Sequence, residues 1–256
     1  MNPTQVPVAN VAFDNLTMPE AVMRIVQMAQ KTDRPRHVCT GNLDHLVILS
    51  RDDEFRTIYG VADLVLADGA PVVWLSRLSR GHRPLRERVA GSDLFWELAR
   101  ASAVTGVRLF FLGGAPCAAD AAADAVRRRY PAAHVCGTYC PPAARFHDAE
   151  EQARIHDAVR AAQPDILLVG FGAPKQEKWI AAHKDSLGVP VAIGVGGTFE
   201  MASGLVRRAP RWAQRAGLEW ACRFLQEPTR LFRRYFLRDL PFLLLLTVRA
   251  LLRNAG

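Results

Sequence analysis

The sequence has 256 residues, half of them apolar, and its formal net charge is +8. The length and apolar content fit one large α/β domain or a domain with an appendage. No signal peptide is predicted, because the N-terminus lacks a basic stretch before an apolar core. The five scattered cysteines lack the second pair or histidine cluster that a zinc site needs, which favours reduced thiols in the cytosol.

Short apolar runs alternate with helical patterns along the chain. Thr17 and Glu20 have the spacing of a capping box and predict the start of the first helix. In chain order, strands are expected within residues 8–16, 36–42, 62–69, 107–114, 134–140, 165–172 and 190–197. Helices are expected within residues 19–30, 43–60, 70–80, 94–104, 118–130 and 175–185, with one more after the Pro-Pro loop at 141–142.

Several expected strands are continuous apolar runs, which is typical of a parallel sheet covered on both faces. The alternation predicts βαβ units in a Rossmann-like, doubly wound, mostly parallel sheet with a helical, Arg-rich C-terminal appendage. We expect an α/β core over residues 1–205 and a basic amphipathic appendage over 206–256. Ligands bind such sheets at the carboxyl ends of the strands. Polar and glycine residues gather at those ends: Thr40, Asn42, Asp68, Gly113, Gly114, Gly172, Lys175, Gln176, Gly196, Gly197 and Thr198.

Two glycine-rich segments, residues 170–179 and 194–204, follow expected strands. Neither fits G-x-G-x-x-G, because Lys175 and Phe199 occupy the sixth positions, and no P-loop motif occurs. This disfavours a dinucleotide-dependent oxidoreductase and a P-loop NTPase. Small residues still allow backbone N–H groups to approach phosphates or a sugar, and Gln176 could pair with a uracil edge or sugar hydroxyls. Tight turns without a ligand are the alternative.

Asp68 stands alone between an apolar strand and the predicted helix start at Ala70. The chain has no Asp-x-Asp tripeptide and no close pair of histidines along the sequence, so no metal site is predicted. A half-buried carboxylate could take a proton from a sugar hydroxyl as a general base. It could equally cap the following helix, which is worth about 1 kcal/mol. The residues alone support both interpretations.

The positive charge is concentrated in the tail. From Val206 onward there are eleven arginines and three acidic residues, whereas the preceding 205 residues carry 22 basic and 22 acidic groups. Such an excess predicts an anionic partner. Arg223, Arg230 and Arg234 share a face if one helix continues through Pro228, and such a face could clamp a diphosphate.

The apolar stretch 241–248 is too short to span a bilayer, which needs about 20 residues. Its flanking arginines predict a helix lying on an anionic membrane surface. A core or oligomer-forming helix is the alternative, and a homo-oligomer is compatible with the sequence. The eight-residue apolar stretch fits lipid better than a nucleic-acid groove, so no nucleic-acid partner is predicted.

Six ordered motifs resemble the WecG/TagA/CpsF family of bacterial glycosyltransferases, over about residues 11–235. They are TGNLDHL, ADGAPVVW, RVAGSDL, VGFGAPKQEKW, GVGGTFEMASG and the segment from RAPRW to RRY. The resemblance implies an inverting, metal-independent enzyme without a cofactor. It would move a sugar from a UDP-sugar to a polyprenyl-diphosphate-linked saccharide, while attached peripherally to the cytoplasmic face of the plasma membrane. A non-catalytic glycan- or lipid-binding protein on the same scaffold is the alternative.

The resemblance also implies roles for individual residues. Asp68 corresponds to the family's base, with Thr40 and Asn42 beside the reacting sugar. Glu200 stands where the family usually has Asp, so its side chain is longer by one methylene group. The substrate-binding residues expected are Arg88, Gly172, Lys175, Gln176, Gly196, Gly197 and Glu200, with Arg223, Arg230 and Arg233 in the tail.

Overall fold

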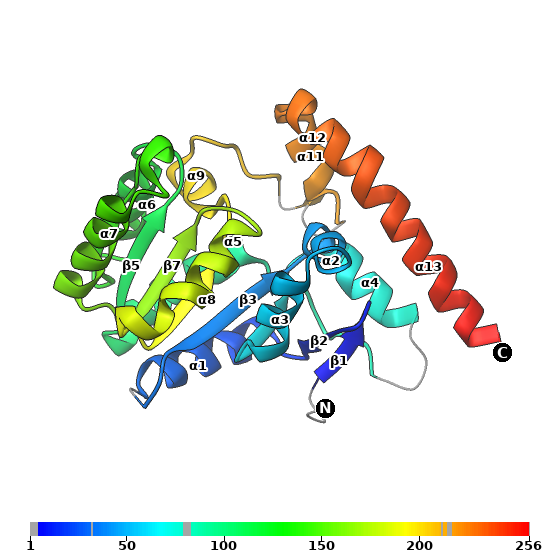
Figure 1. Ribbon diagram of the computed structural model, residues 1–256, viewed down its shortest axis with the longest axis horizontal. Coiled ribbons are helices and arrows are strands. Elements are labelled where there is room, and N and C mark those ends of the chain that lie inside the picture. Colours follow the sequence, from blue (N-terminus) through cyan, green and yellow to red (C-terminus); the bar gives the residue numbers. More distant parts are fainter. Residues whose placement is uncertain (1–4, 32, 79–82, 211, 214–216, 256) are drawn as a thin grey trace. The chain divides into compact units, whose positions relative to one another are not determined.

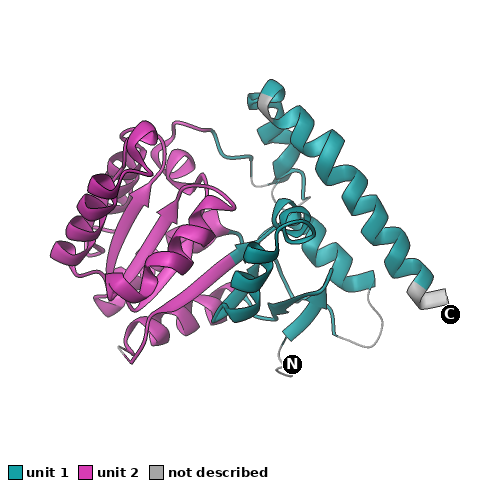
Figure 2. Ribbon diagram, viewed as in Figure 1, with its two compact units in different colours: residues 1–17, 40–90, 207–256 teal, residues 18–39, 91–206 magenta. Residues whose placement is uncertain are grey.

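The computed structural model describes residues 5–31, 33–78, 83–210, 212–213 and 217–255. The chain divides into two compact units (Figure 2). Unit 1 comprises Met1–Thr17, Thr40–Ala90 and Arg207–Gly256, and unit 2 comprises Met18–Cys39 and Gly91–Val206. The tail predicted as an appendage therefore belongs to the same unit as the segment that contains Asp68.

A six-stranded sheet has the order β4-β3-β8-β7-β5-β6. The pairs β3–β8, β8–β7, β7–β5 and β5–β6 are parallel. The strands are β3 (Arg36–Gly41), β4 (Leu64–Ala67), β5 (Arg108–Gly113), β6 (His134–Tyr139), β7 (Ile166–Gly170) and β8 (Val191–Gly194). All residues of β3, β4, β7 and β8 are buried, as expected for parallel strands that are covered on both faces. The predicted Rossmann-like α/β fold is confirmed.

Helices of unit 2 pack against its strands (Figure 1). They are α1 (Met18–Ala29), α5 (Gly91–Thr105), α6 (Ala118–Arg129), α7 (Ala149–Ala162), α8 (Lys175–Leu187) and α9 (Thr198–Ser203), with a short 3-10 turn, η1 (Ala143–Arg145). Phe111 of β5 stacks on Phe199 of α9 with ring centroids 5.3 Å apart. Gly170 leaves room for Phe199, because a Cβ there would lie 2.9 Å from that ring and 3.0 Å from the Gly196 carbonyl oxygen. The aromatic core thus reaches the ends of β7 and β8.

The first expected strand, residues 8–16, is wrong in its bounds. Two strands, β1 (Gln5–Val8) and β2 (Val11–Asp14), pair antiparallel instead. Ala9 and Asn10 connect them with φ angles of 49° and 68°, the left-handed conformation of a tight two-residue hairpin turn. Asp14 then accepts a hydrogen bond of 2.8 Å from the Val65 backbone N–H, which ties the hairpin to β4.

The expected single helix over residues 43–60 is also wrong. The structure has two helices, α2 (Leu43–Leu49) and α3 (Asp53–Val61). The Asp52 carboxylate accepts a hydrogen bond of 2.9 Å from the Phe55 backbone N–H and caps α3. This cap satisfies a backbone donor at the start of α3, so it favours a new helix over continuation of α2.

The C-terminal elements of unit 1 are α11 (Glu219–Gln226), α12 (Pro228–Arg234), the π-helical turn η2 (Tyr235–Asp239) and α13 (Leu240–Ala255). Helix α13 packs along α4 (Ala70–Leu78), and η2 packs on α2 (Figure 1). Pro228 begins a new helix, because proline cannot continue the hydrogen bonding of α11. Arg223 and Arg234 therefore lie on separate helices. The single helix on which they would have shared a face does not form.

Within the described residues, no helix combines the length and apolar character needed to cross a membrane.

Candidate functional site

The carboxyl ends of β3 and β4 lie side by side in unit 1. The Asp68 backbone N–H donates a 2.8 Å hydrogen bond to the carbonyl oxygen of Gly41, which lies between Thr40 and Asn42 in the sequence. Asn42 caps α2 by accepting a 3.2 Å bond from the His45 backbone N–H. The structure thus brings together the strand ends that carry all three residues predicted to be catalytic.

Asp68 is half-buried at the end of β4, and it precedes the helix by two residues. Gly69 occupies the position next to α4, and its carbonyl oxygen accepts a 3.2 Å bond from the Val72 N–H. A φ of +140° at Gly69 explains why glycine occurs at this turn. An N-cap normally adjoins the first helical residue, so Gly69 and not Asp68 has that position. A role of Asp68 as the base stays a prediction.

Arg88 lies next to the same strand end, because the Val89 N–H donates a 2.9 Å bond to the Ala67 carbonyl oxygen. Its Nη1 lies 2.7 Å from Oε2 of Glu219, the first residue of α11. The other carboxylate oxygen of Glu219 lies 3.7 Å from Nε of Arg208. Glu219 thus orients Arg88 from the C-terminal segment. Glu219 was not among the residues predicted from sequence.

The tail arginines predicted to bind a diphosphate lie on two helices. Arg223 is half-buried on α11, and Arg233 is exposed on α12. The Arg230 side chain lies outside the described part of the structure. A diphosphate-binding role for these three arginines stays a prediction.

Two other tail arginines form an ion cluster that the sequence analysis did not predict. Arg234 Nη2 lies 2.9 Å from Asp44 Oδ2, and Arg238 also contacts Asp44. Both guanidinium groups contact Asp239, at 3.6 Å and 3.2 Å. Asp44 follows the Asn42 cap by two residues, so the cluster fixes the C-terminal helices to the first turn of α2. Asp44 and His45 interrupt the otherwise apolar LDHLVIL segment, which is the signal that could have found the cluster.

His45, the residue after Asp44, is buried. Its Nδ1 lies 2.5 Å from the Tyr59 hydroxyl, and its ring meets that of Phe55 edge-on. Burial, reinforced by the positive charge of Arg234, lowers the pKa of His45 to about 3. The imidazole is therefore neutral at physiological pH.

In unit 2, the loops after β7 and β8 are joined by one side chain. Oε1 of Gln176 accepts hydrogen bonds from the backbone N–H groups of Gly172, at 3.1 Å, and Gly196, at 3.0 Å. Gly172 and Gly196 have φ angles of +76° and +56°, which favour glycine. The neighbouring Gly197 directly precedes α9. The structure therefore brings together most of the glycine-loop residues named from sequence.

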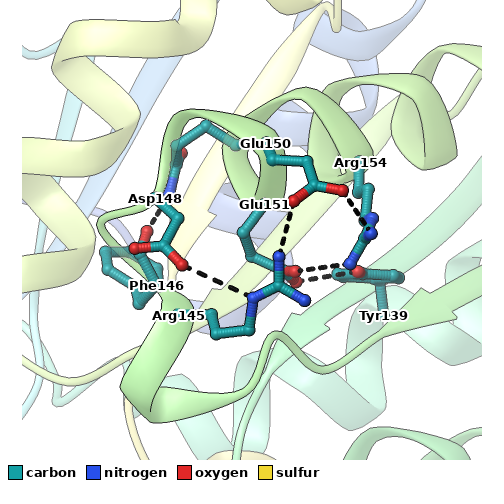
Figure 3. Close-up of polar contacts among 8 residues, drawn as sticks. Tyr139, Arg145, Phe146, Asp148, Glu150, Glu151 and Arg154 are labelled. Atoms are coloured by element: carbon teal, nitrogen blue, oxygen red, sulfur yellow. Dashed lines mark hydrogen bonds and ion pairs between the residues drawn. The ribbon is translucent and has the colours of Figure 1, made fainter.

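Lys175 begins α8, and its Nζ lies 3.3 Å from the centre of the Phe146 ring. Burial lowers the pKa of Lys175. Phe146 belongs to a loop that a charge cluster holds in place (Figure 3). Tyr139 donates a 2.8 Å bond to buried Glu151, and Arg145 lies 2.7 Å from Glu150. This loop therefore positions the aromatic ring that supports Lys175.

Glu200 bridges to the turn after β5. Its Oε1 accepts a 2.8 Å hydrogen bond from the Ala115 backbone N–H. Its Oε2 is buried without a hydrogen-bond partner in the described structure. The carboxylate thus has a protein contact, and a substrate contact stays a prediction.

Among the described residues, no group of three His, Cys, Asp or Glu side chains could hold a metal ion. Metal independence stays a prediction. Thr40, Asn42, Asp68 and Arg88 belong to unit 1, whereas the glycine-loop residues belong to unit 2. That they act in one composite site also stays a prediction.

A family model and individual relatives of known name both assign the chain to one family. The model of the glycosyl transferase WecG/TagA/CpsF family matches residues 6–256. An N-acetylglucosaminyldiphosphoundecaprenol N-acetyl-beta-D-mannosaminyltransferase of Staphylococcus aureus strain MW2 is 30% identical over 236 residues, covering 91% of this chain and 89% of the relative. A protein of the same name from Bacillus spizizenii is 32% identical over 182 residues, covering 70% of this chain and 67% of the relative. The chain belongs to the WecG/TagA/CpsF family of glycosyl transferases.

Proposed function

We propose that this chain is an inverting glycosyltransferase of cell-surface polysaccharide biosynthesis. It moves a sugar, of the N-acetylmannosamine type or another hexose, from a UDP-sugar to a polyprenyl-diphosphate-linked saccharide. The observation that carries the proposal is the similarity to the Staphylococcus aureus mannosaminyltransferase across 91% of the chain. The name of that relative gives both the transferred sugar and a lipid-diphosphate acceptor.

The position of Asp68 supports this chemistry. A half-buried carboxylate at a strand end can accept the proton of an acceptor hydroxyl while that oxygen attacks the anomeric carbon of the donor. The sugar–oxygen bond to the diphosphate then breaks, and UDP leaves with the bonding electrons. A single displacement of this kind inverts the anomeric carbon. Thr40 and Asn42, on the adjoining strand end, are proposed to hold the reacting sugar.

The departing diphosphate requires positive charge or N–H donors. Arg88, Lys175 and the tail arginines Arg223, Arg230 and Arg233 are proposed to supply this charge in place of a metal ion. Backbone N–H groups of the glycine loops other than those of Gly172 and Gly196, which Gln176 already binds, are proposed to face the donor.

The C-terminal helices support attachment to the cytoplasmic face of the plasma membrane. Large apolar side chains of these helices are exposed, and they alternate with arginines. On α12, η2 and α13 the exposed large apolar residues are Phe232, Phe236, Leu237, Leu240, Leu244, Leu245, Val248, Leu251 and Leu252. An apolar face beside basic residues is the pattern of a helix that lies in the interface of an anionic membrane.

A donor panel with a short-chain lipid-diphosphate N-acetylglucosamine acceptor tests the proposal. The full chain should transfer sugar from at least one UDP-sugar, with and without EDTA. The Asp68→Asn variant should lose about 100-fold or more of the rate while it still binds UDP. Asp53→Asn on α3 is a matched control, because its exposed side chain lies on the protein surface.

Two outcomes would contradict the proposal in different ways. If the Asp68→Asn variant turned over normally, Asp68 would not be the base. If no UDP-sugar were consumed but the lipid-linked saccharide still bound, the chain would be a non-catalytic binding protein on this scaffold.

A further inference from the structure

Gln176 joins the two glycine loops from inside the protein. Its side chain is only 2% exposed, and its carbonyl oxygen accepts both the Gly172 and Gly196 N–H groups. An amide oxygen has two acceptor positions, and both are used here. The carbonyl oxygen of Gln176 is thus committed to holding the protein's own loops.

Glu177 determines the orientation of that amide. Nε2 of Gln176 donates a 2.7 Å hydrogen bond to Oε1 of Glu177, whose side chain is fully buried. A flipped amide would turn its N–H donors toward the Gly172 and Gly196 donors and its oxygen toward the carboxyl group of Glu177. The two loop contacts and the bond to the Glu177 carboxylate would be lost, so the glycine N–H groups and Glu177 together select the orientation in which the oxygen faces the loops.

The pair is packed directly against strand β8. A Cβ at Gly194 would lie 2.6 Å from Nε2 of Gln176 and 2.9 Å from Oε1 of Glu177. Oε2 of Glu177 is buried and has no hydrogen-bond partner in the described structure. Burial raises the pKa of Glu177 to about 7, against the opposing effect of its bond from Gln176. The packing against β8 therefore leaves room for the Gln176 amide and the Glu177 carboxyl group only in their present arrangement.

We propose that Gln176 and Glu177 are positioning residues, in which Glu177 orients the Gln176 amide and this amide fixes the spacing of the Gly172 and Gly196 loops. The inference rests on the proposed function in one respect, that these loops receive the UDP-sugar. This role of Gln176 differs from the one expected from sequence, in which Gln176 contacts uracil or sugar directly.

Exchanging the two side chains tests the proposal. In the Gln176→Glu variant two carboxyl groups meet in a buried space, and they repel each other unless they share a proton. In the double variant Gln176→Glu/Glu177→Gln, the amide introduced at position 177 can donate to the carboxylate introduced at position 176. That carboxylate can still accept from both glycine N–H groups.

Hydrogen–deuterium exchange of peptides covering 171–176 and 195–198 reports the loops, and calorimetry with UDP reports binding. The single Gln176→Glu change should speed exchange in both peptides and weaken UDP binding by about tenfold or more, because misplaced loops lose their alignment with the ligand. The double variant should restore both quantities to within about threefold of the original chain. The exposed Gln27→Glu change on α1 is the control and should alter neither.

Each contrary result has a distinct meaning. If the double variant restored slow exchange but not UDP binding, Gln176 would contact the nucleotide directly, and the proposal would be overturned. If exchange were unchanged in a Gln176→Leu variant, which has no acceptor for the two glycine N–H groups, the amide would not hold the loops. If the original chain did not bind UDP, the proposed function would fail, while the exchange data would still decide whether the pair fixes the loops.

Discussion

The guanidinium group of Arg234 lies 2.9 Å from the carboxylate of Asp44, a residue 190 positions earlier in the chain. This contact fixes the end of α12 to the first turn of α2, whose cap is Asn42. Arg238 and Asp239 complete a cluster of two positive and two negative side chains. The elements proposed to meet the membrane and the turn after Thr40 are therefore mechanically linked within one unit.

The Asp44→Asn variant should lose much of this link. The Asp44 and Asp239 side chains are 10% and 7% exposed, so the two guanidinium groups would keep only Asp239 as a largely buried anionic partner in the cluster. The guanidinium groups themselves are about one-third exposed, so water can replace part of the loss. We expect the free energy of unfolding to fall by about 1–3 kcal/mol.

Chemical denaturation, together with hydrogen exchange of α2 and η2, measures this effect. Asp53→Asn provides a matched control, since its 2.7 Å pair with Arg56 lies on the surface and should contribute less than about 1 kcal/mol. Equal losses in the two variants would mean that the cluster does not hold the C-terminal helices.

The pair of Arg88 and Glu219 provides a second prediction. Glu219 holds the Arg88 guanidinium at 2.7 Å, and both side chains are about one-fifth exposed. If Arg88 acts on the substrate through this orientation, Arg88→Ala and Glu219→Ala should each reduce kcat/KM, and the double variant should be little worse than Arg88→Ala. We expect losses of about 10- to 100-fold, from misplacement of one binding group.

Steady-state kinetics of the three variants close this double-mutant cycle. Glu97→Ala removes a comparable carboxylate from the exposed pair with Arg100 and should leave kcat/KM unchanged. Losses that simply add between Arg88→Ala and Glu219→Ala would show that the two residues act independently.

The strands of the sheet could be predicted because burial on both faces leaves a continuous apolar run in the local sequence, as in Ile166–Gly170. Their carboxyl ends, and with them Asp68 and Thr40, followed from the same pattern. The hairpin of β1 and β2 was missed because Ala9-Asn10 is not one of the common turn dipeptides. The end of α2 was missed because Asp52 is as compatible with a solvated helix face as with a cap.

The contacts that support the candidate site could not be predicted from local sequence patterns. Glu219 is 131 positions from Arg88, and only the fold brings them together. Gln176 illustrates a different limit. A glutamine beside glycine loops suggests a ligand contact, whereas its orientation toward the Gly172 and Gly196 N–H groups depends on the burial of Glu177. Sequence indicates which residues gather at strand ends, and side-chain packing decides what each one contacts.

The buried His45 predicts a pH dependence of stability. Its pKa is about 3 in the folded chain, whereas the unfolded chain protonates histidine near the ordinary value of 6.5. Between these values the unfolded state binds more protons, so the free energy of unfolding falls as the pH decreases through this range. The contribution of His45 is about 1.4 kcal/mol per pH unit below 6.5. Above pH 6.5 it vanishes, because the residue is neutral in both states.

The His45→Gln variant removes this titration and keeps a group that can hydrogen-bond the Tyr59 hydroxyl. Denaturation at pH 7.5 and pH 5.0 should show a smaller loss of stability on acidification in the variant than in the original chain, by about 2 kcal/mol. His134→Gln, at an exposed position, should leave the difference between the two pH values unchanged. If His45→Gln and the original chain lost the same stability between pH 7.5 and pH 5.0, the imidazole would be accessible to protons in the folded state.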